Sequence, residues 1–345
     1  MLQPRESSNY QRTVQGSSDT IKVTRVICIF FMTYVHVYLF SDADLEGAPQ
    51  FQLATSIIRD VLGRVSVPLL SIVSGFLLVG YLSRRSFKQA AANRFTVLLV
   101  PIITWNLIWI LVFSLLGVLQ GVDMNDLFPF LGHGSQHHLT FLRDLFVVSM
   151  MAPVLIWALK CAPVSTVAAV ILLTGLIETW PIILRAQILM YFTFGLLFGL
   201  YRLEDYAIYK AGRQLAYIAF GMLLVQVAIG GIAPLDQRSS LTKWITLPIG
   251  VLTFWGISRW AATKSSLMHI VRVVEPAVFL MYLSHGVVAR LLSGVYSQLE
   301  FAHRPWIYTV VWLTIPILCC LAALAGRWLL HQLPNKLSIL VAGKA

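Results

Sequence analysis

Charged side chains are scarce in this sequence of 345 residues. Only 12% of the residues are charged and 58% are hydrophobic, whereas soluble domains are about half apolar and about a quarter charged. This deficit excludes a soluble globular fold, and the 10 Trp, 12 Tyr and 19 Phe exclude a disordered chain. Lipid is the solvent that tolerates such a surface, so the composition predicts a polytopic membrane protein.

Cysteine is also scarce, and we expect no cleavable signal peptide. Cys28, Cys161, Cys319 and Cys320 lie in or beside apolar segments without the spacing of metal ligands. We expect them to be small core residues, and we expect no structural disulfide between the adjacent pair. The first twenty residues are polar and rich in Ser and Gln, which predicts a flexible cytosolic arm over residues 1–20.

Long apolar runs recur along the chain at the length that a membrane-spanning helix needs. Because irregular backbone facing lipid is too costly, these runs predict an all-α protein. We expect a single bundle of about ten transmembrane helices over residues 21–335, followed by a cytosolic tail over 336–345. The expected spans are 22–40, 63–82, 95–120, 141–160, 164–180, 184–201, 213–234, 242–259, 272–293 and 306–330.

Basic residues are unevenly distributed among the loops between these spans. With the N-terminus in the cytoplasm, 18 of the 26 Lys and Arg residues fall on the inner side, which predicts that both termini are cytoplasmic. The formal net charge of +11 therefore has a topological origin, and we expect no nucleic-acid partner.

Several prolines lie inside the expected spans and predict kinks that neighbouring helices relieve. Glu275 directly precedes one of them, and we expect this carboxylate to pair with a cytosolic arginine. The prolines are Pro68, Pro101, Pro153, Pro248, Pro276 and Pro316.

Ionisable residues within a membrane span are costly and are therefore candidate functional groups. Arg25 and His36 are eleven residues apart in the first expected span. At 100° per residue they lie within about 20° of one helix face, about 16 Å apart along the axis, and Ile29 and Thr33 share that face. Arg25 is either a snorkelling anchor or an anion ligand at the inner end. His36 is either a satisfied core histidine or a general base near the outer end.

Six motifs resemble those of the membrane acyltransferase-3 family and occur in the expected order over about residues 20–335. They are Arg25-x10-His36, Val67–Phe76, Arg94 with Pro101, His138–Leu142, Tyr191–Gly195 and Tyr282–His285. Val97 stands where the family's cytosolic pattern has a second Arg, so the phosphate-binding role shifts to Arg84, Arg85 and Lys88. With Arg143-Asp144 after the fourth motif, the chain looks most similar to exopolysaccharide acetyl- or succinyltransferases.

The resemblance implies acyl transfer from cytosolic acyl-coenzyme A, acetyl-CoA or succinyl-CoA, to a hydroxyl of an exopolysaccharide or other surface glycan. It implies a polysaccharide or lipid-linked sugar as acceptor and the inner (plasma) membrane of a bacterium as location, and a homodimer stays an open alternative. We expect His36 to take the proton from the sugar hydroxyl, with a covalent acyl-histidine as the alternative route. Six basic residues on the inner side are expected to bind the phosphates of coenzyme A through charge-assisted hydrogen bonds; the alternative is that they only anchor the topology. They are Lys22, Arg25, Arg84, Arg85, Lys88 and Arg94.

On the outer side we expect His138, Arg143, Asp144 and His285 to contact the substrate. Alternatively, Arg143 and Asp144 pair with one another, and His285 either lines the cavity or lies in the core. We expect no metal site at His133, His137 and His138 because no acidic partner lies at helical spacing. Ser74-Gly75 predicts close helix contact rather than chemistry.

Two other classes of function compete with the enzyme. A transporter or flippase for a glycolipid or anionic metabolite would suit ten spans with buried Arg and His, but no inverted-repeat pair of broken helices is visible. A non-catalytic sensor or a structural subunit of an export complex would not need a cation and a base on one helix face.

Overall fold

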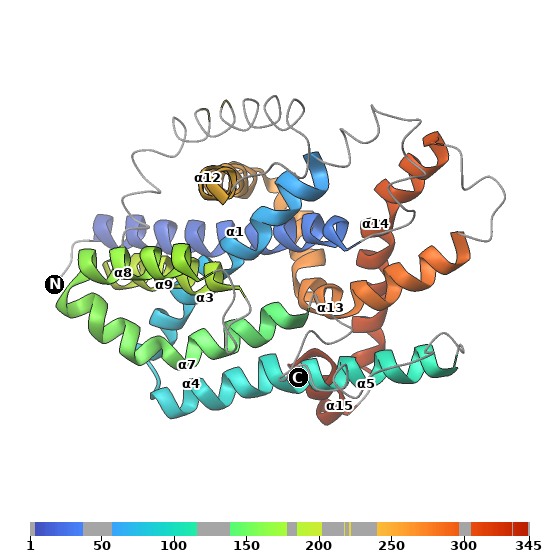
Figure 1. Cartoon of the computed structure of the whole chain (residues 1–345), viewed down its shortest axis with the longest axis horizontal. Coiled ribbons are helices and arrows are strands. Elements are labelled where there is room, and N and C mark those ends of the chain that lie inside the picture. Colours follow the sequence, from blue (N-terminus) through green and yellow to red (C-terminus); the bar gives the residue numbers. More distant parts are fainter. Residues whose placement is uncertain are drawn as a thin grey trace. The chain divides into compact units, whose positions relative to one another are not determined.

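The computed structural model describes residues 4–36, 57–115, 139–177, 185–201, 217, 221, 240–296, 305–332 and 334–343 (Figure 1). These residues are almost entirely helical, and no strand occurs among them. In a helix every interior N–H and C=O is paired within the segment, which is what backbone in lipid requires. The predicted all-α fold is confirmed.

Eleven α-helices follow one another along the described chain, with three short segments of other helical types between them. The α-helices are α1 (Pro4–Val35), α3 (Ser66–Leu82), α4 (Phe87–Arg94), α5 (Val100–Leu115), α7 (Thr140–Cys161), α8 (Pro163–Leu176), α9 (Ala186–Tyr201), α12 (Ser240–Ala262), α13 (Ser265–Tyr296), α14 (Pro305–Leu330) and α15 (Asn335–Ala342). The others are the π-helical η2 (Ile57–Leu62) and η4 (Phe95–Leu99) and the 3-10 segment η3 (Gly63–Val65).

Among the described residues, five stretches of helix are long and apolar enough to cross a membrane, so the protein is a multi-pass membrane protein. They are Ile57–Leu82, Phe87–Val112, Thr140–Cys161, Ser265–Leu292 and Thr309–Leu330. Each coincides with an expected span, and the expected spans 22–40, 164–180, 184–201 and 242–259 also overlap a described helix. The expected span 213–234 lies outside the described residues except at 217 and 221. The total of ten and the cytoplasmic termini stay predictions.

The segment expected as a cytosolic arm over 1–20 is helical from Pro4 onward, because α1 begins there and runs unbroken to Val35. Its flexibility and its cytosolic location stay predictions. Extending an existing helix restricts the backbone of only one residue for each hydrogen bond gained. Starting a new helix restricts several residues for its first hydrogen bond and therefore costs more conformational entropy. The apolar half of α1 can therefore carry the helix back into the polar segment. At the other end, α15 occupies most of the expected tail.

At two of the prolines expected to cause kinks, the helix changes type just before the proline. Proline removes the hydrogen bond to the carbonyl four residues earlier and clashes with it. For Pro68 that carbonyl belongs to Arg64 in the 3-10 segment η3, and for Pro101 it belongs to Val97 in the π-helical η4. The other four prolines lie inside α7, α12, α13 and α14.

The chain divides into two compact units. Unit 1 comprises Met1–Leu70, Tyr201–Val278 and Tyr296–Pro316, and unit 2 comprises Ser71–Leu200, Phe279–Val295 and Ile317–Ala345. In unit 1, α1 packs against α12 and η3. Phe31 of α1 meets Phe254 of α12 edge to face, with ring centroids 5.4 Å apart. These contacts bury one face of α1, including Ile29 and Met32.

In unit 2, α3 and α9 approach closely enough that only glycine fits at two positions. A Cβ on Gly75 would strike the carbonyl oxygen of Phe192, and a Cβ on Gly195 would strike the backbone of Ile72. The expectation of close helix contact at Ser74-Gly75 is therefore confirmed. Elsewhere in unit 2, α15 packs on α5, and the Trp105 indole N–H donates to the carbonyl of Val341 at 2.9 Å.

The four cysteines are free thiols. Cys28 and Cys319 are buried and Cys320 is half-buried, as expected of core residues. Cys161 is exposed, which corrects the expectation for that residue. It is the last residue of α7, where the helix has left the core of unit 2.

Candidate functional site

In unit 1, α1 carries the proposed base and its partner cation. The helix continues from Arg25 to Val35, and His36 lies in the turn that follows directly. Its backbone N–H donates to the carbonyl oxygen of Thr33, three residues earlier, at 3.1 Å, so the last turn closes with a 3-10 type bond. Ile29 and Thr33, which share the Arg25 face of α1, are both buried.

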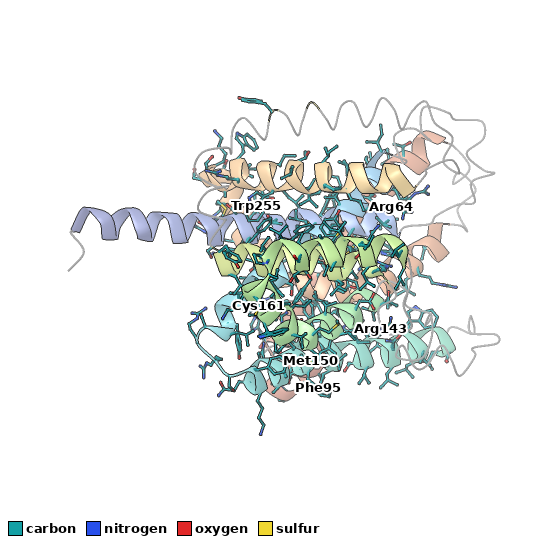
Figure 2. All side chains as sticks on the ribbon, turned by 60° about the vertical axis from the view of Figure 1, so that its left-hand side comes forward. Arg64, Phe95, Arg143, Met150, Cys161 and Trp255 are labelled. Atoms are coloured by element: carbon teal, nitrogen blue, oxygen red, sulfur yellow. The ribbon has the colours of Figure 1, made fainter. Side chains whose placement is uncertain are left out.

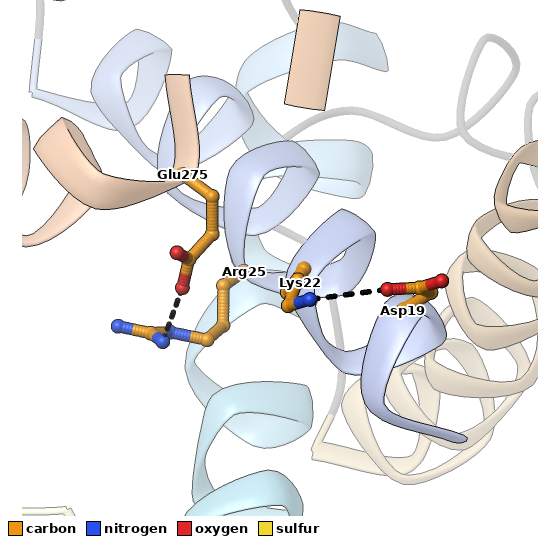
Figure 3. A network of polar contacts seen from close by, with 4 residues as sticks. All are labelled: Asp19, Lys22, Arg25 and Glu275. Atoms are coloured by element: carbon orange, nitrogen blue, oxygen red, sulfur yellow. Dashed lines mark hydrogen bonds and ion pairs between the residues drawn. The ribbon is translucent and has the colours of Figure 1, made fainter. Parts of the chain in front are cut away.

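The Arg25 guanidinium is held by an acidic residue from a distant part of the sequence. Its Nη1 donates to Oε1 of Glu275 on α13 at 2.5 Å, and the two side chains are 29% and 18% exposed (Figure 3). One turn earlier, Lys22 Nζ lies 3.1 Å from Asp19 Oδ1 on the same helix. The expected pairing of Glu275 with an arginine is confirmed, and both cations predicted on α1 have a carboxylate partner.

Four further cations lie on the turn after α3 and on α4, within unit 2. Arg84, Arg85 and Lys88 are exposed. A capping box formed by Ser86 and Gln89 fixes the start of α4. Arg94, at the end of α4, is half-buried and donates to the carbonyl of Ser74 at 3.4 Å.

These four cations, named here the α4 cations, share one feature. Within the described part of the chain, no Asp or Glu forms an ion pair with any of them. Lys22 and Arg25 belong to unit 1, and the α4 cations belong to unit 2. Among the described residues, the α4 cations are the predicted inner cations that no acidic side chain pairs with.

At the start of α7 two adjacent charged residues pair with each other. Oδ1 of Asp144 accepts from Nη2 of Arg143 at 2.9 Å and from its Nε at 3.3 Å. The side chains are only 5% and 0% exposed. Figure 2 shows Arg143 near one end of α7 and Cys161 at the other. Of the two predicted roles for this pair, mutual pairing is therefore present in the structure.

Two aromatic residues of α13 lie beside this pair in unit 2. The ring centroids of Tyr282 and His285 are 5.8 Å apart, and Nδ1 of His285 lies 2.6 Å from the backbone carbonyl oxygen of Tyr282. Phe141 of α7 meets Tyr282 edge to face at 6.1 Å. Both Asp144 and Arg185 act electrostatically on the Tyr282 phenol. We name Arg143, Asp144, Arg185, Tyr282 and His285 the α7–α13 cluster.

Sequence reasoning found part of this cluster. Three of its members were predicted to contact substrate: Arg143, Asp144 and His285. Tyr282 is predicted only as part of the Tyr282–His285 motif, because no spacing in the sequence connects it with Asp144. His138 lies outside the described residues. In the part of the chain that the structure covers, no three His, Cys, Asp or Glu side chains gather as a metal site would require.

The fold and these groups define a class: an all-helical, multi-pass membrane protein with ionisable side chains held between its helices. A family model described as an acyltransferase domain, that of the acyltransferase-3 family, matches residues 19–330. The chain therefore belongs to the acyltransferase-3 family and is an acyltransferase of the membrane type. Comparisons with curated proteins and with solved structures find no significant match.

Proposed function

We propose that this acyltransferase moves an acyl group, acetyl or succinyl, from cytosolic acyl-coenzyme A to a hydroxyl of an exopolysaccharide or other surface glycan. One observation carries the proposal: within the acyltransferase domain, helix α1 bears a guanidinium paired with Glu275, and the turn that directly follows this helix holds His36, eleven residues after Arg25. Imidazole is suited to proton transfer near neutral pH because its reference pKa is close to that pH.

In this mechanism His36 takes the proton of the acceptor hydroxyl as its oxygen attacks the thioester carbonyl carbon. The C–O bond forms, the C–S bond breaks, and coenzyme A leaves as a thiolate that takes up the proton from the imidazolium. Arg25 is the anion-binding partner on the same helix, and Glu275 fixes its orientation. The alternative route forms an acyl-histidine first and transfers its acyl group to the hydroxyl in a second step.

The α4 cations support the assignment of coenzyme A as donor. Coenzyme A carries a diphosphate and a 3′-phosphate, and guanidinium and ammonium groups bind phosphate through charge-assisted hydrogen bonds. We propose that Arg84, Arg85, Lys88 and Arg94 bind these phosphates, with Lys22 and Arg25 contributing from α1. The absence of acidic partners for the four α4 cations among the described residues leaves their charge for such a ligand.

The remaining assignments follow from transfer across a membrane. We propose about ten helices in the plasma membrane of a bacterium, with both termini in the cytoplasm. The acceptor is a polysaccharide or lipid-linked sugar on the outer side, where His138, Arg143, Asp144 and His285 contact it. No metal takes part in the proposed reaction.

The proposal is tested by mass spectrometry of the secreted polysaccharide from cells with and without this protein. The added mass identifies the acyl group, and an unchanged glycan contradicts the proposal. A second measurement follows the melting temperature of the purified protein in detergent with coenzyme A, acyl-coenzyme A or a sugar lipid. Stabilisation by the sugar lipid alone would favour a transporter.

A further inference from the structure

The turn that holds His36 lies at the end of α1, where a helix is least constrained. Val35 is the last residue of α1, and His36 follows in a turn that the bond from its backbone N–H to the Thr33 carbonyl closes at 3.1 Å. Helix ends fray because their last carbonyl groups lack donors within the helix. A base at this place therefore needs contacts from outside α1 to keep a fixed position.

Tyr34, two residues before His36, connects this turn to α14. Its hydroxyl donates to the backbone carbonyl oxygen of Leu313 at 3.0 Å. Its ring lies against the indole of Trp312, with ring centroids 4.5 Å apart, and Tyr34 and Trp312 are only 5% and 2% exposed. All three residues belong to unit 1. The Tyr34 side chain is thus held both at its hydroxyl and at its ring.

The acceptor of this hydrogen bond lies close to a proline. Pro316 lies inside α14, and it lacks the N–H that would bond the carbonyl four residues earlier, that of Trp312. Where a proline interrupts a membrane helix, neighbouring helices provide partners for the backbone groups around it. Leu313 is the next residue after Trp312, and Tyr34 provides such a donor from α1. The end of α1 and the proline region of α14 are therefore hydrogen-bonded to each other.

Other elements of unit 1 hold the same turn by packing. A Cβ on Gly63 of η3 would strike the side chain of Val35 and the carbonyl oxygen of Phe31, so the backbone of η3 lies directly on the last turn of α1. Phe31 also meets Phe254 of α12 edge to face. Apolar packing is not directional, whereas a hydrogen bond is. The bond from Tyr34 therefore adds a directional restraint that packing alone does not provide.

We propose that Tyr34 is a positioning residue for His36. Two residues of helix or 3-10 turn rotate the chain by about 200–240°, so Tyr34 anchors the turn from a side other than the one on which His36 projects. A general base acts only within hydrogen-bond reach of its proton, and a displacement of about 1 Å can cost about a hundredfold in rate. The inference rests on the proposed function, because the residue that is positioned is the proposed base.

The test removes the Tyr34 hydroxyl and keeps its ring. In Tyr34→Phe the bond to Leu313 is lost and the ring still packs on Trp312. Thr314→Val is the matched control, because Thr314 Oγ1 donates to the carbonyl of Val311 at 2.8 Å and this hydrogen bond lies within α14. Melting temperatures of the full-length variants in detergent show that each is folded.

The first measurement is acyl transfer from acetyl-CoA or succinyl-CoA to the surface glycan in membrane vesicles that contain each variant. We expect Tyr34→Phe to lower kcat about tenfold or more and to leave KM for the donor unchanged, as for a displaced base. A merely structural role would lower the amount of folded protein and leave the kcat of each folded molecule unchanged. Thr314→Val should keep both constants.

The second measurement does not depend on activity. Hydrogen–deuterium exchange is followed by mass spectrometry over a peptide that contains Thr33–His36. We expect this peptide to exchange about fivefold faster in Tyr34→Phe, which is the factor that the loss of one hydrogen bond gives. In Thr314→Val its exchange should equal that of the unchanged protein.

His36→Ala is measured alongside so that the two proposals can fail separately. If His36→Ala is inactive and Tyr34→Phe keeps its full kcat, the positioning role is overturned and His36 stays the base. An equal loss of kcat in Thr314→Val, or unaltered exchange over Thr33–His36 in Tyr34→Phe, also overturns it. Normal transfer by His36→Ala, or none by the unchanged protein, contradicts the proposed function, and the positioning role falls with it.

Discussion

Arg25 and Glu275 are 250 positions apart in the sequence and form an ion pair that joins α1 to α13. Both side chains are more than two-thirds buried, so each is the principal counter-charge of the other. The pair sets the orientation of the guanidinium on the helix that also leads to His36. It is therefore both a structural contact of unit 1 and part of the proposed site.

Glu275→Gln should lower both stability and acyl transfer. The change leaves a half-buried guanidinium without its counter-charge, which costs about 1–3 kcal/mol. A lowered melting temperature in detergent and a reduced rate of transfer would show this. The exchange Arg25→Glu with Glu275→Arg should restore the melting temperature and not the transfer, because the cation then projects from α13. Full activity of the exchanged protein would remove Arg25 from the site.

Gly75→Ala should destabilise unit 2, whereas Gly80→Ala on the same helix should not. A Cβ at Gly75 meets the backbone of α9, and overpacking of this kind costs about 1–3 kcal/mol. A Cβ at Gly80 meets no atom within 4 Å, and alanine favours the helix by about 1 kcal/mol. The two melting temperatures measured side by side provide the check. Equal values would contradict the close contact of α3 with α9.

His36→Ala should abolish acyl transfer while protein abundance in the membrane stays unchanged. Positioned general bases contribute about 10²–10⁴-fold to a rate, so the loss should be at least about a hundredfold. His269→Ala is the matched control, because His269 is an exposed histidine of α13 to which no role is assigned. Acylation of the glycan is the quantity measured. Substantial residual transfer in the His36 variant would exclude this residue as the base.

Replacement of Arg84, Arg85 and Lys88 together by Gln should raise KM for acyl-coenzyme A and leave kcat nearly unchanged. Each group contributes binding and no chemistry, and the combined loss should exceed about tenfold. The salt dependence of KM should weaken in the same variant. Lys264→Gln removes another exposed cation and serves as control. An unaltered KM in the triple variant would identify these residues as topological anchors only.

The sequence predicts the helices well and their contacts only in part. Apolar runs of the right length indicate spans because lipid forces the backbone into helices, whatever the details of contact between them. The close contact at Gly75 and the pairing of Glu275 were also predictable. A small residue or an ion in a span has few alternative roles. The helical form of residues 4–20 could not be predicted, because a polar sequence is compatible with both helix and coil.

The membership of Tyr282 and Arg185 in one cluster could not be predicted. They lie almost 100 positions apart, on α13 and just before α9, and only the tertiary fold brings their charges within range of one another.

The contact at Gly75 and Gly195 leaves no room for a lipid tail or a side chain between α3 and α9. Two backbones in direct contact lack a layer of side chains over which one helix might slide. Any motion that accompanies the entry of a substrate must therefore carry α3 and α9 as one rigid body, and the adjustable boundaries of unit 2 lie elsewhere.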